Sequence, residues 1–391
     1  MMKKKIALTS LYTLAFATLS FGEIYEYPYL YKDPRVLGMG GANIAVGGSS
    51  TAVFYNPAGL SNLNPSAGFE VDLLGLNIST NQNSIDFISD LMDAFDTGDL
   101  NHDGDDGDDQ LRAVNDVLKK YRGKNLHFDA SDYSAVARKF SKFSFSIGFL
   151  AGISMNGKTH QGFGSEGILE LDYNSTAGVI AGISYDFLDG DLSVGIDGKY
   201  FYRNTLYHNF SSRELVEHQD DLDTYITDDL AKDGTAASFD FGAIYRLEHL
   251  SLPLVSILKP SVGFSLQNIG DLDFQDAGKI PMTANVGFSI NPKLPFIHNF
   301  LLAADYIDIT EQFNDSSKMK RIRFGGEAQI YDGRFANLTL RAGLYEGYAT
   351  AGLDIRLGLF RIALSTYGEE VGASSGQDED RRYVLSAFLT W

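Results

Sequence analysis

Apolar and polar side chains alternate along most of the chain after about residue 66, in pieces of strand length separated by turn residues. A period of two indicates strands, because successive side chains of a strand point to opposite faces. In the clearest piece, Leu338, Leu340 and Leu344 alternate with Thr339 and Arg341. The pattern predicts fourteen strands, over residues 66–79, 126–140, 143–157, 167–187, 191–208, 235–248, 258–269, 281–291, 299–310, 321–332, 335–346, 348–358, 360–369 and 381–391.

Apolar and polar side chains alternate both in a soluble β-sandwich and in a barrel in lipid, so the alternation does not distinguish the two folds. The lengths of the connections do. Long and short links follow each other: some 46 residues lie between strands 1 and 2, whereas Ser141-Lys142 alone joins strands 2 and 3. Outer-membrane barrels combine short periplasmic turns with longer extracellular loops. Links 6 to 7 and 8 to 9, which contain Pro, and the very short link 11 to 12 are exceptions. We therefore predict an all-β, 14-stranded antiparallel transmembrane β-barrel over residues 65–391, with an acidic, partly helical extracellular loop at 80–125 and a second long loop at 209–234.

The N-terminus has the pattern of a secretory signal. Three lysines precede an apolar run from Ile6 to Leu19, which is too short for a transmembrane helix, and Ser20-Phe21-Gly22 suits signal peptidase. We expect residues 1–22 to be removed. The alternative is a retained N-terminal anchor.

The last strand has the pattern of a sorting signal. Tyr383, Leu385, Leu389 and the terminal Trp391, the only Trp of the chain, lie on one face. Outer-membrane barrels commonly end on such a strand, which the barrel-insertion machinery recognises. We therefore expect outer-membrane lipid and this machinery as partners and the bacterial outer membrane as the location, although an ordinary edge strand would also fit.

Composition narrows the function classes. The net charge of −19 argues against nucleic acid as a partner, and the absence of Cys excludes disulfides and thiolate chemistry. The seven His have no ligand spacing, no Gly-x-Ser-x-Gly elbow is present, and we interpret the glycines of 162–167 as loop glycines. We predict no enzyme, with a barrel lipase or acyltransferase carrying an unmarked triad as the alternative.

A Gly-rich segment separates the signal from the first strand. It contains Gly38, Gly40 and Gly41, and it ends on Asn56-Pro57-Ala58. This segment resembles the FadL family of hydrophobic compound transporters, in which an Asn-Pro-Ala motif ends an N-terminal hatch that threads into a 14-stranded barrel. The resemblance implies a hatch, or plug, over residues 23–64.

The predicted lumen face carries charges that a purely apolar conduit would not need: Asp197, Lys199, Arg323, Glu327, Arg341, Asp354 and Arg356. We expect Arg341 and Arg356 to satisfy backbone carbonyls of the hatch. The acidic residue that FadL members often have near Ser49-Ser50 is absent. Among related groups, the chain looks nearest to the TraF-like plasmid-transfer group or the PorV-like secretion group.

The first long loop holds ten aspartates between Asp86 and Asp109 and no Lys or Arg. Within it, Asp99, Asn101, Asp103 and Asp105 match the first ligand positions of an EF-hand-type loop, which gives a hypothesis of calcium binding. Gln110 replaces the bidentate Glu. The alternative is a solvated acidic loop, and we expect no other cofactor.

Two functions follow from these observations. The first is passive uptake of hydrophobic small molecules through a plugged barrel. The alternative is a non-transporting outer-membrane platform for secretion, conjugal transfer or surface assembly. An importer needs a continuous apolar path past the hatch, whereas a platform needs only a plug.

Overall fold

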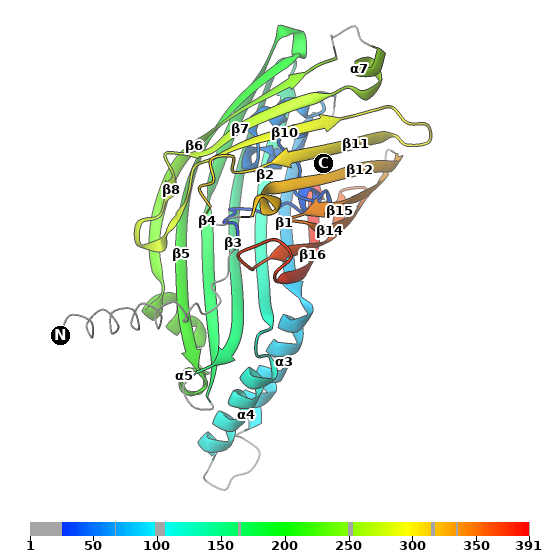
Figure 1. Cartoon of the computed structure of the whole chain (residues 1–391). Helices are drawn as coiled ribbons and strands as arrows, with labels where there is room; N and C mark the ends of the chain where they lie inside the picture. The colour runs from blue at the N-terminus through cyan, green and yellow to red at the C-terminus, as the bar shows by residue number, and fades with distance from the viewer. Residues whose placement is uncertain are drawn as a thin grey trace, which may run out of the picture.

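Fourteen antiparallel strands form one closed barrel, which confirms the predicted fold (Figure 1). The computed structural model describes residues 26–66, 68–97, 106–162, 166–248, 253–313, 317–333 and 335–390. Each barrel strand pairs with the next, and the last pairs with the first, with Ile78 opposite Leu385. The strands are β1 (Phe69–Asn81), β2 (Asn125–Phe140), β3 (Phe143–Gln161), β4 (Gly167–Phe187), β5 (Leu192–Ser211), β6 (Lys232–Arg246), β7 (Ser261–Ile269), β10 (Thr283–Ile290), β11 (Asn299–Tyr306), β12 (Ile322–Asp332), β13 (Ala336–Tyr345), β14 (Tyr348–Leu357), β15 (Phe360–Glu370) and β16 (Glu379–Thr390).

The apolar face of the strands points outward. Val179, Ile196 and Leu340 are about half exposed, whereas the alternating positions, such as Asp197 and Arg341, are buried inside. A soluble sandwich would turn its apolar face into its core. Apolar side chains on the outside and polar side chains on the inside are typical of a barrel whose outer face contacts an apolar medium.

Aromatic side chains gather on the outer face where the strands meet the short turns. This group consists of Phe69, Phe140, Phe143, Tyr185, Phe187, Tyr245 and Phe360. Barrels in membranes carry such aromatic girdles at the membrane interfaces.

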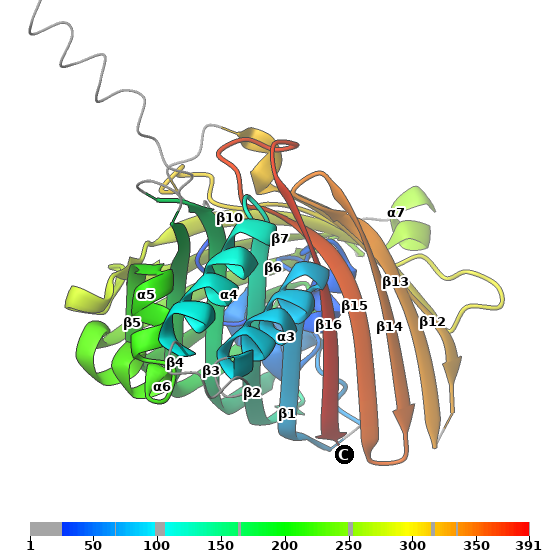
Figure 2. The ribbon, with the colours of Figure 1, turned by 90° about the horizontal axis from the view of Figure 1, so that it is seen from below.

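The β1–β2, β5–β6, β7–β10 and β11–β12 connections leave the same end of the barrel and contain helical turns (Figure 2). They contain α3 (Gln82–Asp96), α4 (Asp106–Lys120), α5 (Ser212–Glu217), α6 (Leu222–Thr224), η5 (Tyr225–Leu230), η7 (Lys318–Arg321) and a small hairpin of β8 (Leu272–Asp273) and β9 (Lys279–Ile280) around η6 (Gln275–Ala277). The side chain of Asn81 caps α3 by accepting from Ser84 N. Helices α3 and α4 pack through Phe87 and Tyr121, whose ring centroids are 5.4 Å apart. In the described parts of the chain, no helix combines the length and the apolar character needed to cross a membrane.

The opposite end of the barrel carries the short turns. Among them are η4 (Leu188–Gly190) and the two longer Pro-containing links, of which the first includes α7 (Pro253–Leu258). The observed strands differ from the predicted ones mainly at this end and at the long loops. Strand β7 starts at Ser261 because α7 runs to Leu258, and β5 extends to Ser211 because it pairs along its whole length with β4.

The segment before β1 runs through the interior of the barrel. It contains α2 (Pro34–Gly38), η1 (Ser50–Phe54) and η2 (Pro57–Asn62). Helix α2 packs against β13 to β16, whereas η2 packs against β3 to β6 on the other side of the ring. Because its contacts reach opposite walls, the segment lies inside the ring of strands. Hereafter residues 26–63 are called the N-terminal segment.

Candidate functional site: the barrel lumen

Arg35 fixes the start of the N-terminal segment to the wall. Its Nε donates to Glu327 Oε2 at 2.9 Å, and its Nη1 donates to the carbonyl oxygen of Gly47 at 2.9 Å. The Glu327 carboxylate also accepts from Arg341 Nε at 2.7 Å. A chain of ion pairs then continues along the wall, from Arg341 to Asp354 and from there to Arg361.

A second anchor joins Glu26 and Lys32 to strands β15 and β16 of the wall. Arg382 on β16 donates to both carboxylate oxygens of Glu26, at 3.0 and 2.9 Å, and Lys32 Nζ lies 2.6 Å from Glu369 Oε2. Burial alone would raise the pKa of Glu26, but the positive charges of Arg382 and Lys32 hold it well below its usual value. Burial opposes the charge of Lys32 as well, yet Glu26 and Glu369 keep its pKa well above the usual range.

Backbone amides of the segment are satisfied by wall side chains. The amide groups of Asn43 and Ile44 both donate to Asp305 Oδ2, at 2.5 and 2.8 Å. Gln267 Nε2 donates to the carbonyl oxygens of Phe54 and Tyr55 at 2.6 and 2.8 Å. These bonds fulfil the requirement that buried backbone groups find partners.

The Asn-Pro-Ala motif makes a tight local structure. Asn56 is the N-cap of η2, with its Oδ1 accepting from Ala58 N at 3.0 Å, and its Nδ2 donates to the carbonyl oxygen of Ile44 at 2.7 Å. Pro57 occupies the first position of η2. A Cβ at Gly242 on β6 would collide with the Asn56 side chain, so the motif is pressed directly against the wall.

Glycine lets the segment approach the wall closely. Gly40 has a φ of +64°, and a Cβ there would collide with the carbonyl oxygen of Phe324. Gly41 also has positive φ, and Gly38 lies against Gly352 of β14. The three glycines that the sequence singled out therefore all lie at wall contacts.

The charged residues predicted for the lumen lie on inward positions of the strands. Lys199 Nζ bonds Asp240 Oδ2 at 2.7 Å, Asp197 lies opposite Asp240 in the strand register, and Arg323 bonds Glu346 Oε1 at 3.0 Å. Arg356 lies opposite Arg361 near the short turns.

The carbonyls of the segment have partners other than those expected. Arg341 donates to Glu327 instead. Among the described residues, Arg356 forms no hydrogen bond or ion pair with the N-terminal segment. Instead, Thr350 Oγ1 donates to the carbonyl oxygen of Gly38 and Ser289 Oγ to that of Ala45, both at 3.0 Å. Neutral hydroxyls serve here because the nearby carboxylates already occupy the arginines.

Two predicted sites fall wholly or partly outside the described residues. The calcium ligands Asp99, Asn101, Asp103 and Asp105 lie there, as does Trp391. Of the C-terminal pattern, Tyr383 and Leu385 lie on the outer face of β16, and Leu389 pairs with Leu73 of β1 and Phe360 of β15.

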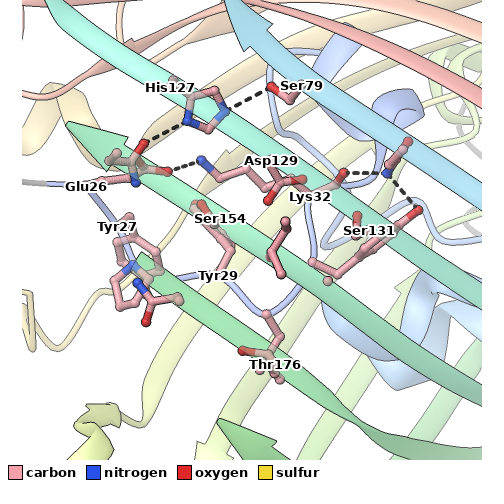
Figure 3. A pocket seen from close by; sticks show the side chains of 18 of the residues that line it. Glu26, Tyr27, Tyr29, Lys32, Ser79, His127, Asp129, Ser131, Ser154 and Thr176 are labelled. Atoms are coloured by element: carbon pink, nitrogen blue, oxygen red, sulfur yellow. Dashed lines mark hydrogen bonds and ion pairs between the residues drawn. The ribbon is translucent and has the colours of Figure 1, made fainter. Parts of the chain in front are cut away.

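Between the N-terminal segment and strands β2 to β5 lies a cavity of about 170 Å³ (Figure 3). Residues 26–32 line one side of it, including Tyr27, Tyr29 and Tyr31. Inward polar residues of the four strands line the other, namely His127, Asp129, Ser131, Ser154, Asn156, Asp172, Asn174, Thr176 and Arg203. Smaller cavities of about 20 to 30 Å³ follow the segment elsewhere.

Three charged groups of this cavity were not singled out from the sequence. Arg203 is 9% exposed and its Nε has no hydrogen-bond partner, and Asp129 makes no hydrogen bond or ion pair with a described residue. Asp172 accepts from Asn174 Nδ2 at 2.9 Å. Period-two alternation could have placed them on the lumen face, but their lack of ion pairs depends on the packing of separate strands.

Solved structures with a similar fold are hydrocarbon channels. One is described as "TodX deltaS2S3 mutant monoaromatic hydrocarbon channel"; it has a TM-score of 0.53 and 10% identity, and the match covers 92% of this chain and 98% of that chain. Another is the Pseudomonas putida toluene transporter TodX, with a TM-score of 0.50, 10% identity, and coverage of 94% and 98%. At this identity the similarity shows the fold alone.

Sequence comparison identifies the family. No curated protein matches the sequence. A family profile described as "F plasmid transfer operon, TraF, protein" matches residues 53–268, from the end of the N-terminal segment to β7. Since this match covers more than half of the 391 residues, the chain belongs to this TraF family.

Proposed function

We propose that the protein is a passive channel of the bacterial outer membrane for small molecules with a hydrophobic body, and that residues 23–64 form the hatch that closes it. The observation that carries the proposal is the position of the N-terminal segment, which runs through the lumen between opposite walls and borders a cavity of about 170 Å³. A preformed concave site between a movable segment and a rigid wall is what a gated channel requires. The solved channels of similar fold agree with this proposal.

The outer-membrane location is supported by the surface of the barrel. Its outer face is apolar, aromatic side chains surround the short-turn end, and long connections leave the other end. Closure leaves no strand edge in the lipid, where each unpaired backbone group would cost several kcal/mol. We assign the long connections to the extracellular side by this analogy.

The hatch proposal can be tested with an engineered disulfide, because the chain contains no Cys of its own. A Cβ placed on Gly182 of β4 would lie 2.8 Å from Cγ1 of Val53, which is close to the geometry of a disulfide. Val53→Cys with Gly182→Cys should therefore lock the segment to the wall. Ser144→Cys with Ser184→Cys links β3 to β4 within the wall and serves as the matched control.

The measurement is uptake of radiolabelled toluene and of radiolabelled pyrogallol, an apolar and a hydroxylated single ring, by cells that carry each variant in the outer membrane. We expect uptake to be lost in the oxidised hatch variant, restored by a reductant, and unchanged in the wall control. Equal uptake by the oxidised and reduced hatch variant would contradict a moving hatch. Uptake of neither probe above that of cells without the protein would contradict the channel itself.

One observation favours a second candidate, a platform for secretion, conjugal transfer or surface assembly. Ion pairs of Arg35 and Lys32 with wall carboxylates hold the segment, and three further cavities that line it measure about 20 to 30 Å³. A platform needs a closed barrel and no apolar path. Uptake of both probes at the background level, together with correct insertion of the protein, would favour this candidate.

A further inference from the structure

We propose that the lumen cavity binds a neutral single-ring molecule that carries two or more hydroxyl groups. The inference rests on the proposed channel function and narrows its substrate class. It follows from the two unlike walls of the cavity and from the charged groups that the polypeptide leaves without partners.

One wall is a polar band across four neighbouring strands. The register places Asp129 of β2 opposite Ser154 of β3, and Ser154 opposite Asn174 of β4. Two residues further along β4, Thr176 lies opposite Arg203 of β5. Figure 3 shows Asp129, Ser154 and Thr176 on this side of the cavity.

The other wall is aromatic and belongs to the N-terminal segment. Tyr27 and Tyr29 lie with their ring centroids 4.8 Å apart, and Tyr31 packs on Tyr133 at 5.4 Å. The Tyr31 hydroxyl accepts from Asn77 Nδ2 at 3.2 Å and the Tyr29 hydroxyl from Arg323 Nη2 at 3.3 Å. The rings are thus held by their hydroxyls, and an apolar ring face can pack against them.

The polar band has hydrogen-bonding capacity that the protein does not use. Arg203 is nine-tenths buried and its guanidinium stacks on the Phe274 ring at 4.5 Å, but its Nε has no acceptor. Asp129 has no donor among the described residues, and Asp172 has only the Asn174 amide. Buried polar groups are normally satisfied, so water or a ligand must supply the acceptor that Arg203 Nε lacks, and the partly exposed carboxylates of Asp129 and Asp172 can accept from the same molecule.

The mixture of charges selects a neutral ligand. A carboxylate at Arg203 would lie in the same cavity as Asp129, Asp172 and Glu26, and an ammonium at the aspartates would lie near Arg203 and Lys32. A hydroxyl group can donate to a carboxylate and also accept from a guanidinium. A hydrocarbon would leave Arg203 Nε and the Asp129 carboxylate without a hydrogen-bond partner, at a cost of about 1 to 3 kcal/mol each.

The size of the cavity limits the ligand to one ring. Its volume of about 170 Å³ is below the roughly 300 to 1,000 Å³ of sites for drug-sized molecules. A ring with hydroxyl groups can lay its apolar face on the tyrosines while its hydroxyls reach the polar band. Alicyclic and phenolic rings share this chemistry.

The test is calorimetric titration of the detergent-solubilised full chain with five single-ring probes: cyclohexane-1,2-diol, pyrogallol, toluene, cyclohexylamine and cyclohexanecarboxylate. We expect saturable binding of cyclohexane-1,2-diol, of pyrogallol or of both, and no binding of the other three probes. Asp129→Asn and Arg203→Gln should each weaken this binding at least tenfold. Asp189→Asn, in the β4–β5 turn where its side chain is 92% exposed, should leave it unchanged.

The opposite results are equally clear. Preferential binding of toluene, of cyclohexylamine or of cyclohexanecarboxylate would overturn the inference in favour of an apolar, a cationic or an anionic ligand. Binding of none of the five would overturn it as well. Arg203→Lys keeps the charge and serves as a second variant in case Arg203→Gln does not fold. An affinity of the Lys variant between those of the wild type and of a protein without the site supports the site. An unchanged affinity contradicts it. Hatch-dependent toluene uptake without hydroxyl-ring binding would remove only this inference and leave the channel.

Discussion

Arg35 of the N-terminal segment and Glu327 of β12 are joined by two hydrogen bonds, Nε to Oε2 at 2.9 Å and Nη2 to Oε1 at 3.2 Å. The pair links residues almost 300 positions apart in the chain, and both side chains are largely buried. Such a two-bond arrangement is directional, so it fixes the orientation of α2 as well as its distance from the wall.

Removing this anchor should destabilise the docked segment. Arg35→Ala leaves the Glu327 carboxylate with Arg341 as its remaining cation, and breaking a buried pair costs about 3 to 5 kcal/mol. The loss of stability is measured as the shift of the urea concentration at which half of the protein is folded into lipid vesicles. Arg112→Ala breaks an exposed pair on α4 and should cost about 0 to 1 kcal/mol. Equal effects of the two substitutions would show that Arg35 is not an anchor.

Gly40 should tolerate no side chain. Gly40→Ala combines left-handed backbone strain of about 1 to 2 kcal/mol with a collision against the carbonyl of Phe324. Gly376→Ala has the strain alone, because a Cβ there meets open space at a φ of +82°. We expect Gly40→Ala to lower the free energy of unfolding by about 1 to 3 kcal/mol more than Gly376→Ala. The same urea titration measures the difference, and no difference would place the segment away from the wall.

The Glu26 anchor gives the closed state a pH dependence of known sign. Its folded pKa lies well below the value of about 4.3 for an unperturbed glutamate, because Arg382 and Lys32 outweigh the effect of burial. The stabilisation is therefore complete above about pH 5 and is lost as the pH falls through the folded pKa. Bilayer conductance should stay low at pH 5 and rise only at more acidic pH, and Glu26→Gln should reduce this dependence. Opening already at pH 6 in the wild type would contradict the anchor.

The calcium hypothesis for the β1–β2 connection remains a prediction from the sequence. Asp99, Asn101, Asp103 and Asp105 have the spacing of the first EF-hand positions, and an acidic loop without a defined site would bind only diffusely. Calorimetric titration with calcium should show one saturable site that disappears in Asp99→Ala with Asp103→Ala. A featureless titration of the unaltered protein would rule the site out.

The barrel could be predicted because the signals that indicate it lie within short stretches of sequence. Each strand shows its two faces in its own residues, as in Leu338 to Leu344, and the alternation of long and short links reports the two ends. The β8–β9 hairpin was missed because two-residue strands have no detectable period. Asp305, which binds the amides of Asn43 and Ile44, also had no local signal, since its role exists only through contacts across the lumen.

The lumen cavity was beyond sequence analysis for a related reason. Gly40 and Asn56 stand out locally, since a glycine-rich stretch and an Asn-Pro step restrict the backbone by themselves. Asp129, Asp172 and Arg203 look like ordinary alternating polar residues of three different strands. What distinguishes them is that they line the cavity without a direct ion pair among the described residues, and that depends on the register of the strands and on the path of the N-terminal segment.

The central claim is that the N-terminal segment closes the lumen, and single-channel recording in planar bilayers tests it most directly. The intact protein should show conductance near zero, because residues 26–63 fill the interior between opposite walls. A variant lacking residues 24–60, verified as an inserted barrel by its heat-modifiable migration on gels, should show a steady open level. An intact protein that already conducts like an open porin, or a correctly inserted deletion variant that stays silent, would contradict the account.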